Sequence, residues 1–174
     1  MKVVVAAFFM LVVACGWGDP VVPLNTQLWR LDRAWEAPPP GARQDVRTAP
    51  GTIIAFRGGG EYVEVHCSLI EQPDQTVLIQ SGRPCVAAVG TWEQRGSEIV
   101  ATRSRVGGPG RPEALRSAFC SQPRLTFRIE GRSVSGNAGG EGTGTYTPVT
   151  RFVAPEFETY VTAARRSDVR CGED

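Results

Sequence analysis

The chain has little of the chemistry that most enzymes and nucleic-acid-binding proteins require. Lys2 is the only lysine among its 19 basic residues, and His66 is its only histidine. Its arginines are balanced by 18 acidic residues, so it lacks the basic excess that binds nucleic-acid phosphates. A Ser/His/Asp site would have to use His66, and the sequence contains no G-x-S-x-G motif for a nucleophilic serine. This composition favours a function without nucleic acid and without catalysis.

The side chains that could act as acids or bases are expected to be ordinary surface residues. His66 is expected on the outward, exposed face of a strand. Glu61, Glu64 and Glu93 are expected to be solvated surface residues rather than an acid–base pair. The glycine-rich segment 136–144 lacks the lysine and the following helix of phosphate-binding loops, so we expect a hairpin loop there. We therefore predict no catalytic residues.

The longest apolar run, residues 3–14, is too short to span a bilayer, which takes about 20 apolar residues. With Lys2 before it and small residues at its end, it has the form of a secretory signal. The end of this run resembles the lipobox of bacterial lipoproteins at Val12-Val13-Ala14-Cys15. The resemblance implies a signal peptide at residues 1–14, fatty acids such as palmitate on Cys15, and a membrane anchor. Cleavage by ordinary signal peptidase is the alternative.

The residue after the cysteine bears on the choice of membrane. In such lipoproteins an aspartate there retains the protein in the inner membrane, whereas this chain has Gly16. The resemblance therefore implies the outer membrane, with the protein on its periplasmic face. Residues 15–26 are expected to be a lipidated tether. Residues 27–174 are expected to be a single domain, because about 150 residues suffice for one core.

Four further cysteines indicate disulfide bonds, and with them an oxidising compartment. They are Cys67, Cys85, Cys120 and Cys171. An even number in an exported protein indicates two disulfides, for which three pairings are possible. We expect Cys67–Cys85 and Cys120–Cys171, which join neighbours in the sequence. A metal site is the alternative, but no zinc-binding spacing occurs, so no metal and no cofactor are expected.

Short segments with a period of two dominate the chain after the proline-rich stretch 37–51. Strands are predicted over residues 52–57, 62–69, 76–80, 86–93, 98–105, 124–130, 133–136 and 143–152. The strand over 62–69 is expected to be half-buried, with Val63, Val65, Cys67 and Leu69 on its buried face. Residues 25–36 fit a helix or a strand, and we favour a strand. Short helices are predicted to begin at Pro112 and Pro155. This pattern indicates an all-β, antiparallel sandwich or barrel.

Two segments resemble the lipocalin-like barrels found in bacterial lipoproteins. Residues 54–64 are similar to their hairpin of strand, glycine turn and tyrosine strand, and Gly90-Thr91-Trp92 is similar to their G-x-W hairpin. The resemblance implies an antiparallel barrel of about eight strands with a short C-terminal helix. The order Cys67, Cys85, Trp92 also resembles small periplasmic metalloprotease inhibitors, in which Asp19–Asn25 would correspond to the inhibitory segment.

Aromatic side chains are candidates to line an apolar pocket in the mouth of such a barrel. They are Trp29, Trp35, Trp92, Tyr62, Tyr146 and Phe127. The alternative is that they fill the interior, because an eight-stranded barrel is narrow enough for side chains to occupy. The sequence thus predicts an exported, lipid-anchored protein that binds a small apolar ligand or an envelope protein without catalysis. A periplasmic protease inhibitor is the alternative, and an envelope enzyme is the third possibility.

Overall fold

The computed structural model describes residues 24, 27–31, 47–138, 143–152 and 154–172, which contain one sheet of nine strands and two α-helices. The strands are β1 (Leu28–Leu31), β2 (Arg47–Arg57), β3 (Glu61–Glu71), β4 (Val77–Ile79), β5 (Val86–Arg95), β6 (Glu98–Gly107), β7 (Arg124–Glu130), β8 (Ser133–Gly136) and β9 (Gly144–Pro148). The helices are α1 (Pro112–Leu115), which continues into a π-helical turn at Arg116–Cys120, and α2 (Glu156–Arg166). None of the helices in these described ranges has the length and apolar character needed to cross a bilayer.

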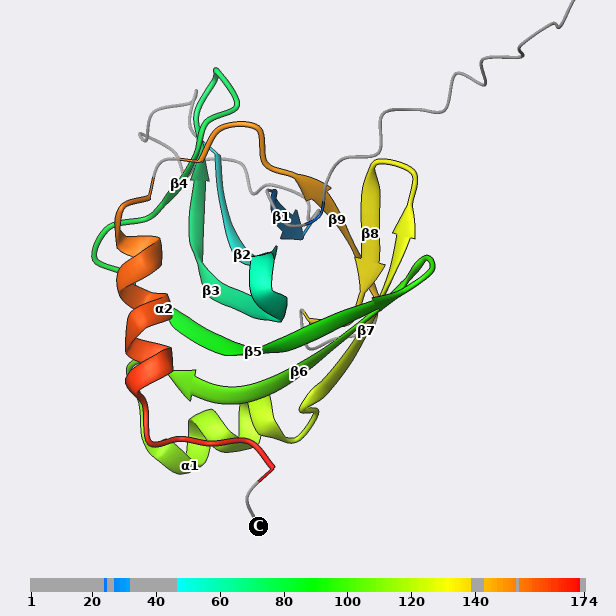
Figure 1. Ribbon diagram of the computed structural model, residues 1–174. Coiled ribbons are helices and arrows are strands. Elements are labelled where there is room, and N and C mark those ends of the chain that lie inside the picture. Colours follow the sequence, from blue (N-terminus) through cyan, green and yellow to red (C-terminus); the bar gives the residue numbers. More distant parts are fainter. Residues whose placement is uncertain (1–23, 25–26, 32–46, 139–142, 153, 173–174) are drawn as a thin grey trace, which may run out of the picture.

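The strands form a closed ring (Figure 1). Strands that follow one another from β5 to β9 pair antiparallel, as do β2 with β3 and β3 with β5, and β1 lies between β9 and β2. The short strand β4 pairs with the end of β3, whereas β5 pairs with its beginning, so β4 extends the sheet beside β5. The result is the predicted antiparallel eight-stranded, lipocalin-like barrel, with α2 near the C-terminus.

Most predicted elements are confirmed. Strands β7 and β8 have their predicted bounds, and the ambiguous segment contributes strand β1. Strand β9 is shorter than predicted because the chain leaves the ring after Pro148. Its next residues cross to β4, where Val77 donates a backbone hydrogen bond to the carbonyl of Arg151 at 3.0 Å.

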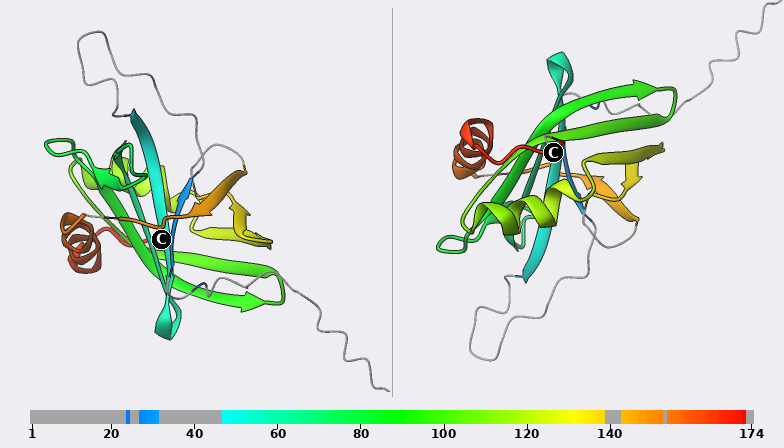
Figure 2. Two further views of the ribbon diagram at one scale, coloured as in Figure 1. Left: turned by 90° about the horizontal axis from the view of Figure 1, so that it is seen from above. Right: turned by 90° about the horizontal axis from the view of Figure 1, so that it is seen from below.

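One hydrophobic core lies outside the ring, under α2. Phe157, Val161 and Ala164 of this helix pack on apolar side chains of β2, β3 and β5. Both views of Figure 2 show the helix beside the barrel wall. Gly107 permits this close approach, because a Cβ there would lie 2.6 Å from the Cα of Ala164. The predicted burial of Val63, Val65, Cys67 and Leu69 on one face of β3 is confirmed, and this face lies outside the barrel. The opposite face is also buried at Tyr62 and Glu64, so in this part of the strand the prediction of a half-buried strand is wrong.

A second core fills one half of the ring interior. Its rings meet edge to face, for example Phe56 against Phe127 with centroids 5.3 Å apart. Gly90 lets β6 approach β5 beside this core, because a Cβ at Gly90 would lie 1.8 Å from the carbonyl oxygen of Thr102. The glycine of the G-x-W segment is thus required by the spacing of two strands.

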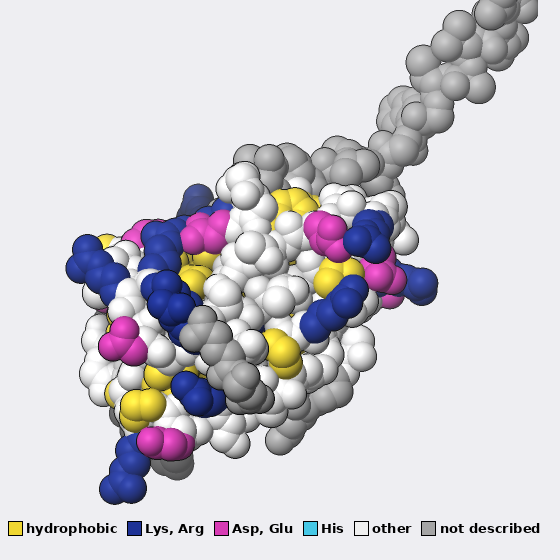
Figure 3. Space-filling model, turned by 60° about the horizontal axis from the view of Figure 1, so that its bottom comes forward, with side chains coloured by type: hydrophobic (Ala, Val, Ile, Leu, Met, Phe, Trp, Pro, Cys, Tyr) yellow, Lys and Arg dark blue, Asp and Glu magenta, His cyan; other side chains and the backbone are white. Residues whose placement is uncertain are grey.

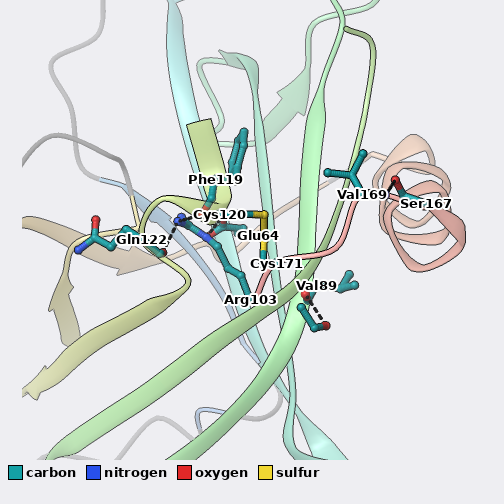
Figure 4. The surroundings of a disulfide bond; sticks show 10 residues. Glu64, Val89, Arg103, Phe119, Cys120, Gln122, Ser167, Val169 and Cys171 are labelled. Atoms are coloured by element: carbon teal, nitrogen blue, oxygen red, sulfur yellow. Dashed lines mark hydrogen bonds and ion pairs between the residues drawn. A yellow bond between two sulfur atoms is a disulfide. The ribbon is translucent and has the colours of Figure 1, made fainter. Parts of the chain in front are cut away.

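Both predicted disulfides, Cys67–Cys85 and Cys120–Cys171, are present. The first ties β3 to the residue before β5, and the second ties the π-helical turn to the C-terminal segment (Figure 4). Their cysteines are 18 and 51 residues apart in the sequence. In the chain-entropy model such loops stabilise the folded state by about 3 and about 4 kcal/mol.

Candidate functional site

Two polar side chains of β3 point into the barrel. Because α2 covers Val63 and Val65 from outside, their neighbours Glu64 and His66 face the interior. The expectation that Glu64 is a solvated surface residue is wrong, since its exposed fraction is 0%. The expectation that His66 is exposed on an outward face is also wrong, since its side chain is half-buried and lies beside Glu64. Glu93 is exposed as predicted, and Glu61 is partly exposed.

Glu64 forms an ion pair with Arg103 of β6. Nε of Arg103 lies 2.8 Å from Oε1 of Glu64, and Nη2 donates to Oε2 at 3.0 Å. The same guanidinium donates to the carbonyl oxygens of Phe119 and Gln122, both at 3.1 Å, and of Ala138 at 3.3 Å (Figure 4). Arg103 is only 4% exposed. This one side chain therefore joins the barrel wall to the segment after α1 and to the end of β8.

Tyr62 completes the surroundings of the carboxylate, because its hydroxyl donates to Oε2 of Glu64 at 2.6 Å. Burial alone would raise the pKa of Glu64, but the contacts with His66 and Arg103 outweigh it and lower that pKa below its usual value. Burial and the neighbouring carboxylate raise the pKa of Tyr62 well above 10.0. Glu64 is therefore ionised at neutral pH, and Tyr62 keeps its proton.

His66 connects this carboxylate to a hydroxyl group. Its Nε2 lies 3.3 Å from Oε1 of Glu64, and its Nδ1 lies 3.2 Å from Oγ1 of Thr52 on β2. The contact between Nε2 and Oε1 is electrostatic and lacks hydrogen-bond geometry. With the ring proton on Nε2, the side facing the carboxylate, Nδ1 accepts the hydroxyl proton of Thr52. This tautomer is assigned from the partners. The ring also meets Phe119 edge to face, with centroids 4.9 Å apart.

A pocket of about 290 Å³ opens over Thr52 and His66. We call it the mouth pocket; it is lined by Pro50, Gly51, Thr52, His66, Cys67, Ser68 and Pro84. Thr52 and His66 are paired across β2 and β3, and so are Pro50 and Ser68. Thr52 and His66 form the central pair of the β2–β3 register, and Pro50 and Ser68 lie two pairs further from the Gly58–Gly60 turn. The mouth pocket therefore lies beside the middle of this hairpin, on the side away from its turn.

The aromatic residues predicted to line a pocket lie in a different place. Trp29, Tyr62, Phe127 and Tyr146 are at most 2% exposed and belong to the interior core, and Trp92 packs against it. Nε1 of Trp92 donates to the carbonyl oxygen of Arg57 at 2.9 Å, just before the turn. The structure thus brings these five together in the half of the barrel away from the mouth pocket. Trp35 lies outside the described residues.

The sequence analysis missed the group of Thr52, His66, Glu64 and Arg103. The signal that was available is the alternation of Tyr62, Glu64 and His66 along one strand whose other face is apolar. In the described ranges, the structure has no group of three or more His, Cys, Asp or Glu side chains placed to hold a metal ion. Cys15 lies outside them.

Fold and site together define a lipocalin-like barrel with a buried ion pair beneath a polar mouth. Neither a family model nor a curated protein matches the sequence.

We predict that Glu64→Gln lowers the free energy of unfolding by about 3–5 kcal/mol, because it leaves the Arg103 guanidinium buried without a counter-charge. The matched control is Glu61→Gln, at the start of the same strand, whose partner Arg165 is on the surface. A surface pair of this kind contributes about 0–1 kcal/mol. Urea unfolding measures both variants, and equal losses would contradict a special role for the buried pair.

The lowered pKa of Glu64 also predicts how stability depends on pH. The folded state binds the proton of this carboxyl less tightly than the unfolded chain, so the stabilisation is complete above the ordinary pKa of about 4.3. It is lost as the pH falls through the lower pKa of the folded state. The stability difference between wild type and Glu64→Gln should narrow on acidification below that ordinary value. A difference that stays constant down to acid unfolding would refute this assignment.

Proposed function

We propose that this protein is an exported, lipid-anchored binding protein whose ligand site is the mouth pocket. The observation that carries the proposal is the division of the barrel interior. Aromatic side chains fill one half, whereas the other half has polar side chains and opens into a pocket of about 290 Å³. That volume is near the lower end of the range for small-molecule sites, which is about 300–1,000 Å³.

The lining of the mouth pocket indicates the class of ligand. Pro50 and Pro84 offer apolar surface, whereas Thr52, His66 and Ser68 offer hydrogen-bonding groups. Small-ligand sites commonly combine apolar walls with a few placed polar groups. The ligand is therefore a small molecule with an apolar part and at least one hydrogen-bonding group.

Export is supported by two kinds of observation. The structure has two disulfides, and such bonds persist in oxidising compartments. The lipobox-like sequence adds a membrane anchor at Cys15, on the periplasmic face of the outer membrane.

One face of the molecule favours a small ligand over a protein partner. On the face shown in Figure 3, the hydrophobic side chains of the described residues form small separate areas among charged side chains. Stable protein interfaces have an apolar centre in a contiguous patch. This face offers several isolated apolar areas instead, whereas the mouth pocket is one defined concavity.

The anchor predicts a covalent modification. In bacteria that express the full chain and are fed radiolabelled palmitate, the wild-type protein should carry the label and fractionate with membranes. Cys15→Ser should lose both properties, because the thiol is the acylation site, while Cys67 and Cys85 remain as unlabelled internal controls in a disulfide. Label that persists in Cys15→Ser would overturn the assignment.

The ligand site predicts a small molecule that is retained through purification. The full-length protein is purified from the bacterial envelope, and the compounds released on denaturation are identified by mass spectrometry. Ser68→Trp fills the mouth pocket and should abolish retention, whereas Thr145→Trp, an exposed position on β9, should preserve it. Equal retention by both variants, or none by the wild type, would contradict a ligand site in the mouth.

A further inference from the structure

The floor of the mouth pocket has the arrangement of an activated nucleophile. A hydroxyl, an imidazole and a carboxylate lie in series, with 3.2 Å from Oγ1 of Thr52 to Nδ1 of His66 and 3.3 Å from Nε2 of His66 to Oε1 of Glu64. A nucleophile within hydrogen-bond reach of a base that is itself oriented by a third group is the signature of covalent catalysis. The series also opens onto a pocket, since Thr52 and His66 both line it.

We propose that Thr52 is a nucleophile, that His66 is its general base, and that the mouth pocket hydrolyses small esters. The inference rests on the proposed function, because it takes the mouth pocket as the ligand site. Thr52 and His66 are the catalytic residues, and Glu64 is a positioning residue that acts through His66.

The surroundings of Glu64 suit this role. Arg103 and Tyr62 hold its carboxylate in place with bonds of 2.6–3.0 Å, so the base is oriented by a group that cannot turn away. Oε1 of the ionised Glu64 lies 3.3 Å from Nε2 of His66, without hydrogen-bond geometry, and its negative charge favours the ring proton on Nε2. Nδ1 is then free to accept the hydroxyl proton of Thr52. Glu64 also stabilises the imidazolium that forms when this proton moves, as the carboxylate does in other hydroxyl–imidazole–carboxylate sites.

The reaction balances with water as the second reactant. Oγ1 of Thr52 attacks the ester carbonyl carbon while its proton moves to Nδ1 of His66, and the bond to the alcohol oxygen breaks. The proton then passes from Nδ1 to the departing alkoxide, which leaves as the alcohol, with the acyl group on Thr52. Water attacks this acyl group and gives its proton to Nδ1, and the bond between acyl carbon and Oγ1 breaks. Oγ1 recovers the proton, and a carboxylic acid is released.

The size of the pocket limits the substrate. Thr52 is only 4% exposed, so an acyl group must enter the mouth pocket to reach Oγ1. A volume of about 290 Å³ admits a short acyl chain with a small alcohol. The substrate class is therefore small esters, for which p-nitrophenyl acetate is a suitable probe.

A fluorophosphonate probe tests the nucleophile directly. The probe forms a bond between phosphorus and an activated hydroxyl oxygen and releases fluoride, and intact-mass and peptide mass spectrometry locate the adduct. On the full-length wild-type protein we expect one adduct, on Thr52. Thr52→Ser should keep the labelling, whereas Thr52→Val, which has nearly the same shape, should abolish it. The matched control Thr91→Val, an exposed position on β5, should label like the wild type.

Hydrolysis of p-nitrophenyl acetate tests the base. His66→Gln should lower the rate by about 100-fold or more, the usual contribution of general base catalysis. For Glu64→Gln, kcat per folded molecule should fall while KM stays close to that of the wild type, because Glu64 acts through His66 and does not line the mouth pocket. A purely structural role of Glu64 would not separate kcat from KM in this way. Unfolding midpoints of each variant separate these effects from misfolding.

The outcomes distinguish this inference from the proposed function. Wild-type protein without an adduct, or with hydrolysis no faster than that of Thr52→Val, overturns the nucleophile. If Ser68→Trp still abolishes ligand retention in that case, the mouth pocket remains a binding site without catalysis. If Thr52 is labelled but no ligand depends on the mouth pocket, the proposed retention of a ligand fails while the reactive hydroxyl stands.

Discussion

The ion pair between Glu64 and Arg103 is the interaction on which the interior of this barrel depends. Moving two charges out of water is expensive, and attraction between them compensates only when the geometry is good and the remaining hydrogen-bonding groups are satisfied. Here two nitrogens of Arg103 lie within 3.0 Å of the carboxylate, and three backbone carbonyls accept hydrogen bonds from Nη1 and Nη2, whereas Nε and Oε1 are held by charge alone. A buried pair of this kind fixes the position of its neighbours, and here those neighbours are Tyr62 and His66.

This pair also explains why the barrel has two different halves. On one side of Tyr62, rings of Phe56 and Phe127 pack edge to face and leave the interior apolar. On the other side, the carboxylate and guanidinium require polar neighbours, and Thr52 and His66 supply them up to the mouth pocket. The polar half of the interior is therefore held in place from two sides. The aromatic rings pack against it on one side, and on the other the backbone carbonyls that accept hydrogen bonds from Arg103 fix the guanidinium.

The fold could be predicted from the sequence where one face of a strand is apolar and the other is polar. Strand β7 has Leu125 and Phe127 inside and charged residues outside, and its bounds were predicted correctly. The site could not be predicted in this way. Strand β3 is buried on both faces from Tyr62 to Val65, so alternation does not say which face is inside. Glu64 is also separated from Arg103 by 39 residues. A partner so distant leaves no local pattern, and only the closed ring brings the two together.

The closure of the ring has a consequence for how the chain acquires its structure. Strand β1 pairs with β2 on one side and with β9 on the other, so residues at the two ends of the domain meet, such as Trp29 and Pro148. Contacts between segments so far apart in sequence form slowly, because a long loop must be closed first. A growing polypeptide cannot complete the cylinder until its final strand emerges, so the barrel assembles late and as one cooperative unit.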